Sequence, residues 1–244
     1  RGKYEKDIYD SLNFTLTEAQ IRVLREIRSD LACNKPMNRL IQGDVGSGKT
    51  IVAILSAAIV ISHGAQAAVM APTEILAEQH YHSFLKICEP AGIQIEILTG
   101  NMKKMERKQI INDLESGEIQ LIVGTHALIQ EGVNFKDLGL IIVDEQHRFG
   151  VQQRKDLINK SYFPEVIALT ATPIPRTLAF TIHGDMELSI IDELPKNRLP
   201  IITKVTKPGN TEKIYDFMKK EMDSKRQCFV IYPIIEESET TDWK

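Results

Sequence analysis

The chain has 244 residues, of which 43% are hydrophobic and 26% are charged, and its formal net charge at pH 7 is −3. This composition is that of a globular protein, and the length fits one large domain or two small ones. No stretch stays apolar over the ~18 residues that a transmembrane helix needs, so no membrane partner is expected. The slight acidity gives no overall attraction to nucleic acid, although a local basic track would not register in the total charge.

The N-terminus carries neither the apolar core of a signal peptide nor an initiator methionine, and we therefore expect a segment of a longer protein. Cys33, Cys88 and Cys228 are too far apart and too few for a disulfide framework or a zinc site, which favours a reducing, cytoplasmic setting. His80 and His82 would face different sides of a helix and would make a poor metal-binding pair.

The first strong element in the chain is a helix. Thr17 and Gln20 have the spacing of a capping box, and the turn-forming residues 34–36 end the helical pattern. The apolar positions between them recur at helical spacing: Ile21, Leu24, Ile27 and Leu31. A short strand at 39–42 and a long apolar helix at 50–61, buried on most sides, are predicted next.

Short apolar runs bounded by turn residues then recur, at 67–71, 93–98, 119–123, 138–143 and 166–170. Helical stretches separate most of them, notably 75–88 and 102–116. Strands alternating with helices of this length predict an α/β fold, with a mainly parallel sheet and helices on both of its faces. The continuous run 140–143 fits a central strand, whereas the alternation in 93–97 suggests a strand nearer an edge.

The character of the sequence changes after Ile191, where a polar stretch with two prolines begins. We predict a first domain at 1–192, a linker at 193–204 and the start of a second α/β domain at 205–244. The last segment is expected to hold a helix at 211–223 and a strand at 227–232, which together are too few elements to bury a core.

A glycine-rich loop joins the predicted strand at 39–42 to the helix that follows it. Residues 43–50 read G-x-x-x-x-G-K-T, and the candidate nucleotide ligands are Gly43, Asp44, Val45, Gly46, Ser47, Gly48, Lys49 and Thr50. Glycines let backbone N–H groups approach phosphates, the lysine carries charge to the β- and γ-phosphates, and the threonine hydroxyl faces Mg²⁺. A chance glycine-rich turn is the alternative, and the apolar residues on both flanks argue against it.

An acid pair, Asp144 and Glu145, follows the apolar run 140–143, at the strand end where open α/β sheets bind ligands. We predict that Asp144 holds Mg²⁺ and that Glu145 positions or deprotonates the attacking water, with Lys49 and Glu145 as the catalytic residues. Two solvated acids opening a turn would be the ordinary interpretation of such a pair in isolation.

Two longer motifs narrow the class. They read DEQHRFGVQQR at 144–154 and LTATPIPRTLA at 169–179. Together with the glycine-rich loop they resemble superfamily 2 helicases and, more narrowly, the RecG family of bacterial ATP-dependent DNA helicases. Matching motifs at 14–20 and 184–189 extend the resemblance over nearly the whole chain. The nearest rival is the transcription-repair coupling family, which usually has Glu at position 146 and an aromatic residue at position 47.

The resemblance implies a RecA-like P-loop domain that uses ATP and Mg²⁺ to remodel branched DNA in recombination and repair. It implies adenine contacts from Phe14 and Gln20, although the Gln20 amide is also the partner of Thr17 in the capping box. Backbone contacts to DNA without sequence specificity are implied for Pro72, Thr73, Thr125 and His126, and a Thr73 helix cap is itself a natural phosphate site.

Gln146 and His147 would link the nucleotide to Thr170 and Thr172, so that loss of the γ-phosphate changes interdomain contacts. Three arginines have several possible roles, as interdomain ion pairs, as DNA contacts or as solvated charges: Arg148, Arg154 and Arg176. The basic run 103–108 is either a solvated helix face, which is the commoner case, or a surface that contacts DNA.

The family clamps ATP between two RecA-like domains, the second of which supplies an arginine finger worth ~10³ to 10⁵ in rate. The second motor domain and the wedge domain that splits the fork are the partners expected from the longer protein. This chain by itself is expected to bind nucleotide weakly and to hydrolyse it slowly or not at all. A nucleotide kinase would need an Arg-rich lid, which the sequence lacks. A nucleotide-responsive interaction module without turnover stays open.

Overall fold

A computed structural model describes residues 2–145, 149, 151–172, 186–193, 201–206, 209 and 211–231. The chain divides into two compact units, Arg1–Arg198 and Leu199–Lys244. No helix in the described ranges combines the length and the apolar character needed to cross a membrane.

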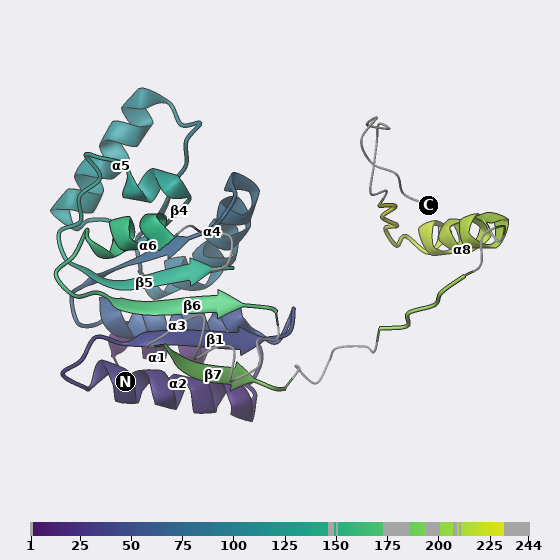
Figure 1. Cartoon of the computed structure of the whole chain (residues 1–244), viewed down its shortest axis with the longest axis horizontal. Coiled ribbons are helices and arrows are strands. Elements are labelled where there is room, and N and C mark those ends of the chain that lie inside the picture. The colour runs from purple at the N-terminus through teal and green to yellow at the C-terminus, as the bar shows by residue number, and fades with distance from the viewer. Residues whose placement is uncertain are drawn as a thin grey trace. The chain divides into compact units, whose positions relative to one another are not determined.

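The first unit is built on a seven-stranded sheet in the order β3-β4-β2-β5-β6-β1-β7, and every pairing is parallel (Figure 1). Its strands are β1 (Asn38–Gly43), β2 (Gln66–Met70), β3 (Ile95–Leu98), β4 (Leu121–Gly124), β5 (Leu138–Asp144), β6 (Glu165–Thr170) and β7 (Glu187–Ile191). Because all strands run the same way, their carboxyl ends share one edge of the sheet.

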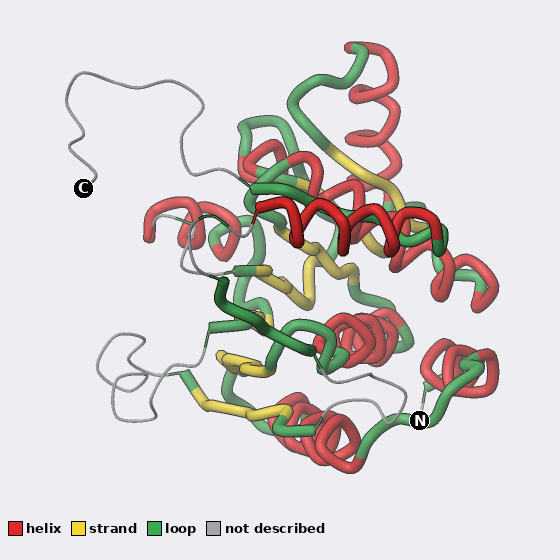
Figure 2. The backbone as a smooth tube through the Cα atoms, turned by 90° about the vertical axis from the view of Figure 1, so that its right-hand side faces the viewer, coloured by secondary structure: helices red, strands yellow, loops and turns green. Residues whose placement is uncertain are grey.

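Helices cover both faces of the sheet (Figure 2). The described helices of this unit are α1 (Lys3–Ser11), α2 (Glu18–Leu31), α3 (Lys49–Ile61), α4 (Glu74–Cys88), α5 (Lys104–Ser116) and α6 (Val151–Ile158), with the short 3₁₀ helices η1 (Glu89–Ala91) and η2 (His126–Ile129). Alternate strand residues enter two separate cores. One lies against α1 to α4, and the other lies against α5, α6 and η2.

Local chemistry explains where these helices begin. The Thr17 hydroxyl accepts from the backbone N–H of Gln20, and the side-chain oxygen of Gln20 accepts from the backbone N–H of Thr17. These two bonds complete the predicted capping box of α2. Residues 51–61 of α3 are all buried, as expected for a helix that is apolar on all sides. The predicted α/β fold, with a parallel sheet between two helical layers, is confirmed.

Helices α1 and α6, the two short 3₁₀ helices and strand β7 of the first unit were missing from the sequence-based prediction. Helix α1 has Gly2 at its N-cap without any side-chain cap, so it lacks a start signal. Strand β7 is short and lies at the edge of the sheet beside β1. The predicted edge position of the 93–98 strand is confirmed, since β3 lies at the opposite edge.

In the second unit, helix α8 (Thr211–Asp223) confirms the helix predicted at 211–223. The strand predicted at 227–232 is wrong over its described part, because residues 227–231 have no regular structure. An isolated strand leaves its backbone N–H and C=O groups unpaired. Phe229 and Ile231 are 84% and 89% exposed, which agrees with the absence of a partner strand in the described part of this unit.

Candidate nucleotide site at the carboxyl edge of the sheet

The predicted phosphate, magnesium, DNA-contact and coupling residues that the structure describes lie on segments that leave the carboxyl edge of the sheet, whereas Phe14 and Gln20 lie before and at the start of α2. The loop at 43–50 follows β1, the acid pair closes β5, and Thr170 closes β6, the strand between β1 and β5. Strand register aligns these ends, since Gln42 pairs with Thr170 and Asp144 pairs with Leu169. The candidate DNA contacts follow β2 and β4, further along the same edge.

The glycine-rich loop adopts a conformation that depends on its glycines. Gly46 and Gly48 have φ values of 80° and 87°, in the left-handed region that side chains disfavour. A Cβ atom on Gly43 would lie 2.5 Å from the Ser47 Oγ and 3.2 Å from the Ile191 Cβ. The loop is therefore packed from inside by Ser47 and from β7 by Ile191, which leaves no room for a side chain at position 43.

Lys49 begins α3 and turns back over the loop. Its Nζ donates to the carbonyl oxygens of Gly43 and Asp44, at 2.6 and 3.0 Å. Burial lowers the pKa of Lys49, and the negative charges of Asp144, Glu145 and Asp44 oppose that change. The lysine and both members of the acid pair therefore form one electrostatic cluster, although they lie almost a hundred residues apart in sequence.

The acid pair occupies the end of β5 with an unusual backbone turn. Glu145 has a φ of 48°, which is uncommon for a residue with a side chain and often marks functional sites. The Asp144 Oδ2 lies 2.8 Å from the Nε2 of His80 on α4, and both side chains are 15% exposed. Because an ionised carboxylate can only accept, the imidazole Nε2 is the donor in this bond.

His80 was not among the predicted site residues, since the sequence suggested it only as half of a poor metal pair with His82. One available signal was that His80 lies seven residues, or about two helical turns, after Thr73, which puts the two residues on the same face of the helix. Nothing local in the sequence indicates that this face meets β5.

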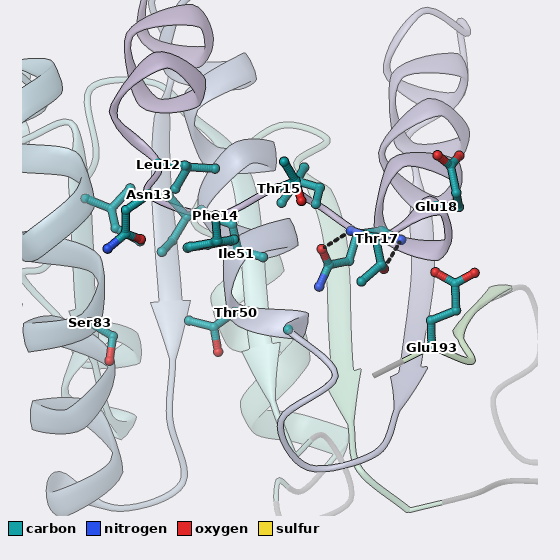
Figure 3. A pocket seen from close by; sticks show the side chains of 15 residues that line it. Leu12, Asn13, Phe14, Thr15, Thr17, Glu18, Thr50, Ile51, Ser83 and Glu193 are labelled. Carbon is teal, nitrogen blue, oxygen red and sulfur yellow. Dashed lines mark hydrogen bonds between the residues drawn. The ribbon is translucent and has the colours of Figure 1, made fainter. Parts of the chain in front are cut away.

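A cavity of about 1570 Å³ lies between the segment that precedes α2, the first turns of α3 and helix α4. Phe14, Thr50 and Ile51 line it (Figure 3). Phe14 is half-exposed, so its ring offers a surface on which a planar group can stack. The two residues predicted to contact adenine are thus both placed at this cavity, since Gln20 is also among its lining residues.

The Gln20 side chain is buried, and both ends of its amide are already bonded. Oε1 accepts from the Thr17 N–H, and Nε2 donates to the Ser47 carbonyl oxygen at 2.8 Å. Gln20 thus connects the start of α2 to the glycine-rich loop. An adenine contact through this amide requires one of the two bonds to be given up.

Glu193 is a further cavity residue that the sequence analysis did not identify. Its carboxylate points toward the first turn of α2 in Figure 3 and accepts from the Ala19 N–H at 3.1 Å. The neighbouring Asp192 forms an exposed ion pair with Arg22 on α2. The segment that leaves β7 is therefore held to α2 at the mouth of the cavity.

The residues predicted to contact DNA lie in two different environments. Thr73 is exposed and caps α4, with its hydroxyl accepting from the Leu76 N–H, and Pro72 precedes it. His126 is exposed at the start of η2, whereas Thr125 is 2% exposed and its hydroxyl has no hydrogen-bond partner within the described ranges. A DNA contact from Thr125 would therefore need its surroundings to move.

The loop that precedes the basic run is fixed to α4. Glu74 accepts from the Gly100 N–H and from the Asn101 side chain. Lys103, Lys104 and Lys108 are exposed, and the structure leaves both alternatives for the run 103–108 open.

Part of the predicted coupling network is placed. The hydroxyls of Thr170 and Thr172 are 2.8 Å apart, and the Thr172 N–H donates to the Thr170 hydroxyl. The remaining members, Gln146 and His147, lie outside the described residues. The same holds for Arg148, for Arg176 and for the side chain of Arg154.

Comparison with known proteins identifies the family. The model of the DEAD/DEAH box helicase family matches residues 17–180. Curated relatives include the ATP-dependent DNA helicases RecG of Synechocystis sp., 51% identical over 243 residues, and of Bacillus subtilis, 51% identical over 232 residues. These alignments cover 100% and 95% of this chain but 29% and 34% of the relatives, so the chain spans about a third of their length.

Solved structures give the same result. The chain aligns with a structure described as RecG bound to a three-way DNA junction, with a TM-score of 0.84 and 42% identity over 96% of this chain and 32% of the other. The Hef helicase domain of Pyrococcus furiosus, 23% identical with a TM-score of 0.53 over 71% of this chain and 38% of the other, shares the fold. From the glycine-rich loop, the acid pair and the residues that the family model matches, the chain belongs to the DEAD/DEAH box helicase family.

Proposed function

We propose that this chain is the ATP-binding motor domain of a RecG-like DNA helicase, which couples ATP hydrolysis to the remodelling of branched DNA in recombination and repair. The observation that carries the proposal is the electrostatic cluster of Lys49, Asp144 and Glu145 behind a glycine-rich loop, in a chain about half identical to RecG helicases. The structural relative bound to a three-way DNA junction supports branched DNA as the substrate class.

The residues at the carboxyl edge fit ATP and Mg²⁺. The loop has the positive φ angles of an anion-binding turn and leads into the N-terminus of α3, where free N–H groups attract phosphate. Lys49 supplies positive charge, and the Thr50 hydroxyl and the Asp144 carboxylate are oxygen ligands of the kind that Mg²⁺ prefers. When bound, the ion would neutralise charge that develops on the transferred phosphoryl group.

The protein's own residues would mainly position the nucleotide and the attacking water. To do so, Lys49 and Gln20 would exchange hydrogen bonds within the protein for bonds to the nucleotide. In the structure Lys49 donates to two loop carbonyls, and these bonds must be released for its ammonium to reach the β- and γ-phosphates. Glu145 would orient the attacking water and take its proton. Phe14 and Gln20 would hold the adenine, with Gln20 exchanging its bond to Ser47 or to Thr17 for the base.

For DNA, we assign backbone contacts to Pro72 and Thr73 at the start of α4, and to Thr125 and His126 at η2. The start of α4 offers N–H groups to a phosphate, and such contacts position a strand without reading its sequence. Thr170 and Thr172 would relay nucleotide state together with Gln146 and His147.

We further propose that residues 1–192 form this motor domain, that 193–204 form a linker and that 205–244 begin a second motor domain. The catalytic site would be completed by that second domain, and a wedge domain of the longer protein would engage the fork. A cytoplasmic location fits a DNA-remodelling role.

The test is ATP hydrolysis by the full-length protein with fork, duplex and single-stranded DNA. We expect stimulation by branched DNA, and we expect Glu145→Gln to lower the stimulated rate by about 10²-fold or more while ATP still binds. Stimulation by none of the three DNAs would contradict the helicase function. An unchanged cellular function of Glu145→Gln, with ATP binding retained, would favour an interaction module without turnover.

A further inference from the structure

The bond between His80 and Asp144 connects α4 to the acid pair. Thr73, the proposed DNA contact, caps this helix, and His80 lies two turns further along it. The Nε2 of His80 is 2.8 Å from the Asp144 Oδ2. The helix that carries a proposed DNA contact therefore also holds the carboxylate proposed to bind Mg²⁺.

The His80 ring is itself held in place. It meets the ring of Phe84, one turn further along α4, edge to face, with centroids 6.3 Å apart and an interplanar angle of 86°. Phe84 is 1% exposed and belongs to the core beneath α4. Because Phe84 is packed in that core, it gives the His80 imidazole a fixed neighbour on one side.

The bond to His80 gives the two carboxylate oxygens of Asp144 different roles. Oδ2 accepts from His80, and among the described residues no hydrogen bond to Oδ1 is found, so this oxygen can face a metal ion or a water molecule bound to one. Hydrogen bonds from neighbouring side chains commonly orient a metal-binding carboxylate in this way, and their loss typically weakens metal affinity or activity by about 10- to 100-fold.

We propose that His80 is a positioning residue, which holds the Asp144 carboxylate in the orientation that receives Mg²⁺ at the nucleotide site. The proposal rests on the proposed function, because it takes Asp144 as the magnesium-side carboxylate. Because His80 is proposed to act through its bond to Asp144, its effect should be confined to the part of nucleotide affinity that Mg²⁺ provides.

The experiment measures the affinity of the full-length protein for a fluorescent, non-hydrolysable ATP analogue, in saturating Mg²⁺ and in EDTA. The ratio of the two dissociation constants reports the contribution of the metal. His80→Ala is expected to lower this ratio by about tenfold and to leave the affinity in EDTA unchanged. His80→Gln, which places an N–H donor at a similar reach, should recover most of the ratio.

His82→Ala is the matched control, because His82 is an exposed histidine on the same helix without a bond to the acid pair. It should behave as the unsubstituted protein. A His80→Ala ratio equal to that of His82→Ala would overturn the proposal. Equal losses in Mg²⁺ and in EDTA would also overturn it, because they would show a structural role alone.

Asp144→Asn separates this proposal from the proposed function. If the unsubstituted protein shows no Mg²⁺-dependent affinity, or if Asp144→Asn leaves it intact, the proposed magnesium site itself is wrong. If Asp144→Asn abolishes the metal contribution and both His80 variants retain it, the site stands and only the role of His80 is refuted.

Discussion

Two glycines at opposite ends of α3 allow two costs of a side chain in the nucleotide loop to be measured separately. One is the strain of a left-handed backbone, and the other is the steric clash with neighbouring atoms. Gly48 precedes the helix with a φ of 87°, and Gly64 follows it with a φ of 90°. A Cβ atom on Gly48 would lie 2.2 Å from the Gln20 Nε2, whereas a Cβ atom on Gly64 would meet no atom within 4 Å. Alanine at either position is therefore strained, but at Gly48 it also displaces Gln20.

The magnitudes follow from these contacts. A left-handed backbone costs a non-glycine residue roughly 1–2 kcal/mol, so Gly64→Ala should lower the free energy of unfolding by about that amount. Gly48→Ala carries the same cost. It also breaks the bond from Gln20 to the buried side of the loop, which adds about 1–3 kcal/mol for an unsatisfied carbonyl. The expected total for Gly48→Ala is about 2–5 kcal/mol.

Urea unfolding of the chain, followed by far-ultraviolet circular dichroism, measures both losses, and a fluorescent ATP analogue measures binding. We expect Gly48→Ala to be the less stable variant and to lose nucleotide affinity, while Gly64→Ala keeps it. Equal stability losses in the two variants would refute the reasoning, because they would show that displacement of Gln20 has no cost.

Three further predictions, two substitutions and one chemical modification, concern this site and the core beside it. Gln20→Glu keeps an acceptor for the Thr17 N–H but places a second acceptor against the Ser47 carbonyl oxygen. Nucleotide affinity, measured with the fluorescent ATP analogue, should therefore fall about tenfold. The cap of α2 should survive, so helix content measured by circular dichroism should not change. Ser47→Ala removes a buried hydroxyl without a described partner, and its urea midpoint should be unchanged or higher. Burial raises the pKa of Cys88 to about 12, so at pH 8 a thiol reagent should modify exposed Cys33 and spare Cys88 until the chain unfolds.

Cys88 also makes the stability of the fold depend on pH. The folded state holds the Cys88 thiol protonated to about pH 12, whereas an unfolded cysteine ionises near its ordinary pKa of about 8.5. The stabilisation is therefore fully present below about pH 8.5 and is lost as the pH rises toward 12. Cys88→Ala should remove this alkaline decline, which urea midpoints measured across the pH range would detect.

The parts of the fold that follow local rules could be predicted from sequence. The capping box of α2, the long apolar run of α3 and the continuous β5 each carry their own signal, and the structure has all three. The alternation in 93–97 also predicted an edge strand, because a strand with one exposed face alternates. Such signals are local, and neither distant pairing nor tertiary burial is needed to interpret them.

The errors occur where stability comes from distant partners. Helix α1 has no capping side chain and is held through buried Ile8 and through an ion pair from buried Glu5 to Arg28 on α2. The strand predicted at 227–232 has the apolar content of a strand but no neighbour that could accept its hydrogen bonds in the described part of its unit. The hydrophobic pattern alone predicts neither the presence of α1 nor the absence of a strand at 227–232, because both depend on which residues pack against the segment.

The candidate site shows the same division between local and distant information. The loop and the acid pair could be read from motifs, but the residues that hold them in place come from α2 and α4. Gln20 holds the loop through Ser47, and His80 holds Asp144. Neither residue stands beside its partner in sequence, so the support of the site becomes visible only when the helices are packed against the sheet.

Helix α2 then has two roles that the sequence analysis did not connect. Through Gln20 it contacts the nucleotide loop, and through Ala19 and Arg22 it holds Glu193 and Asp192, where the chain leaves the sheet. Both attachments are within the first two turns of one rigid helix. If Gln20 exchanges its loop bond for a nucleotide base, the force on α2 acts at the end that anchors this exit segment. The nucleotide loop and the segment at 192–193 are therefore both attached to the first turns of α2.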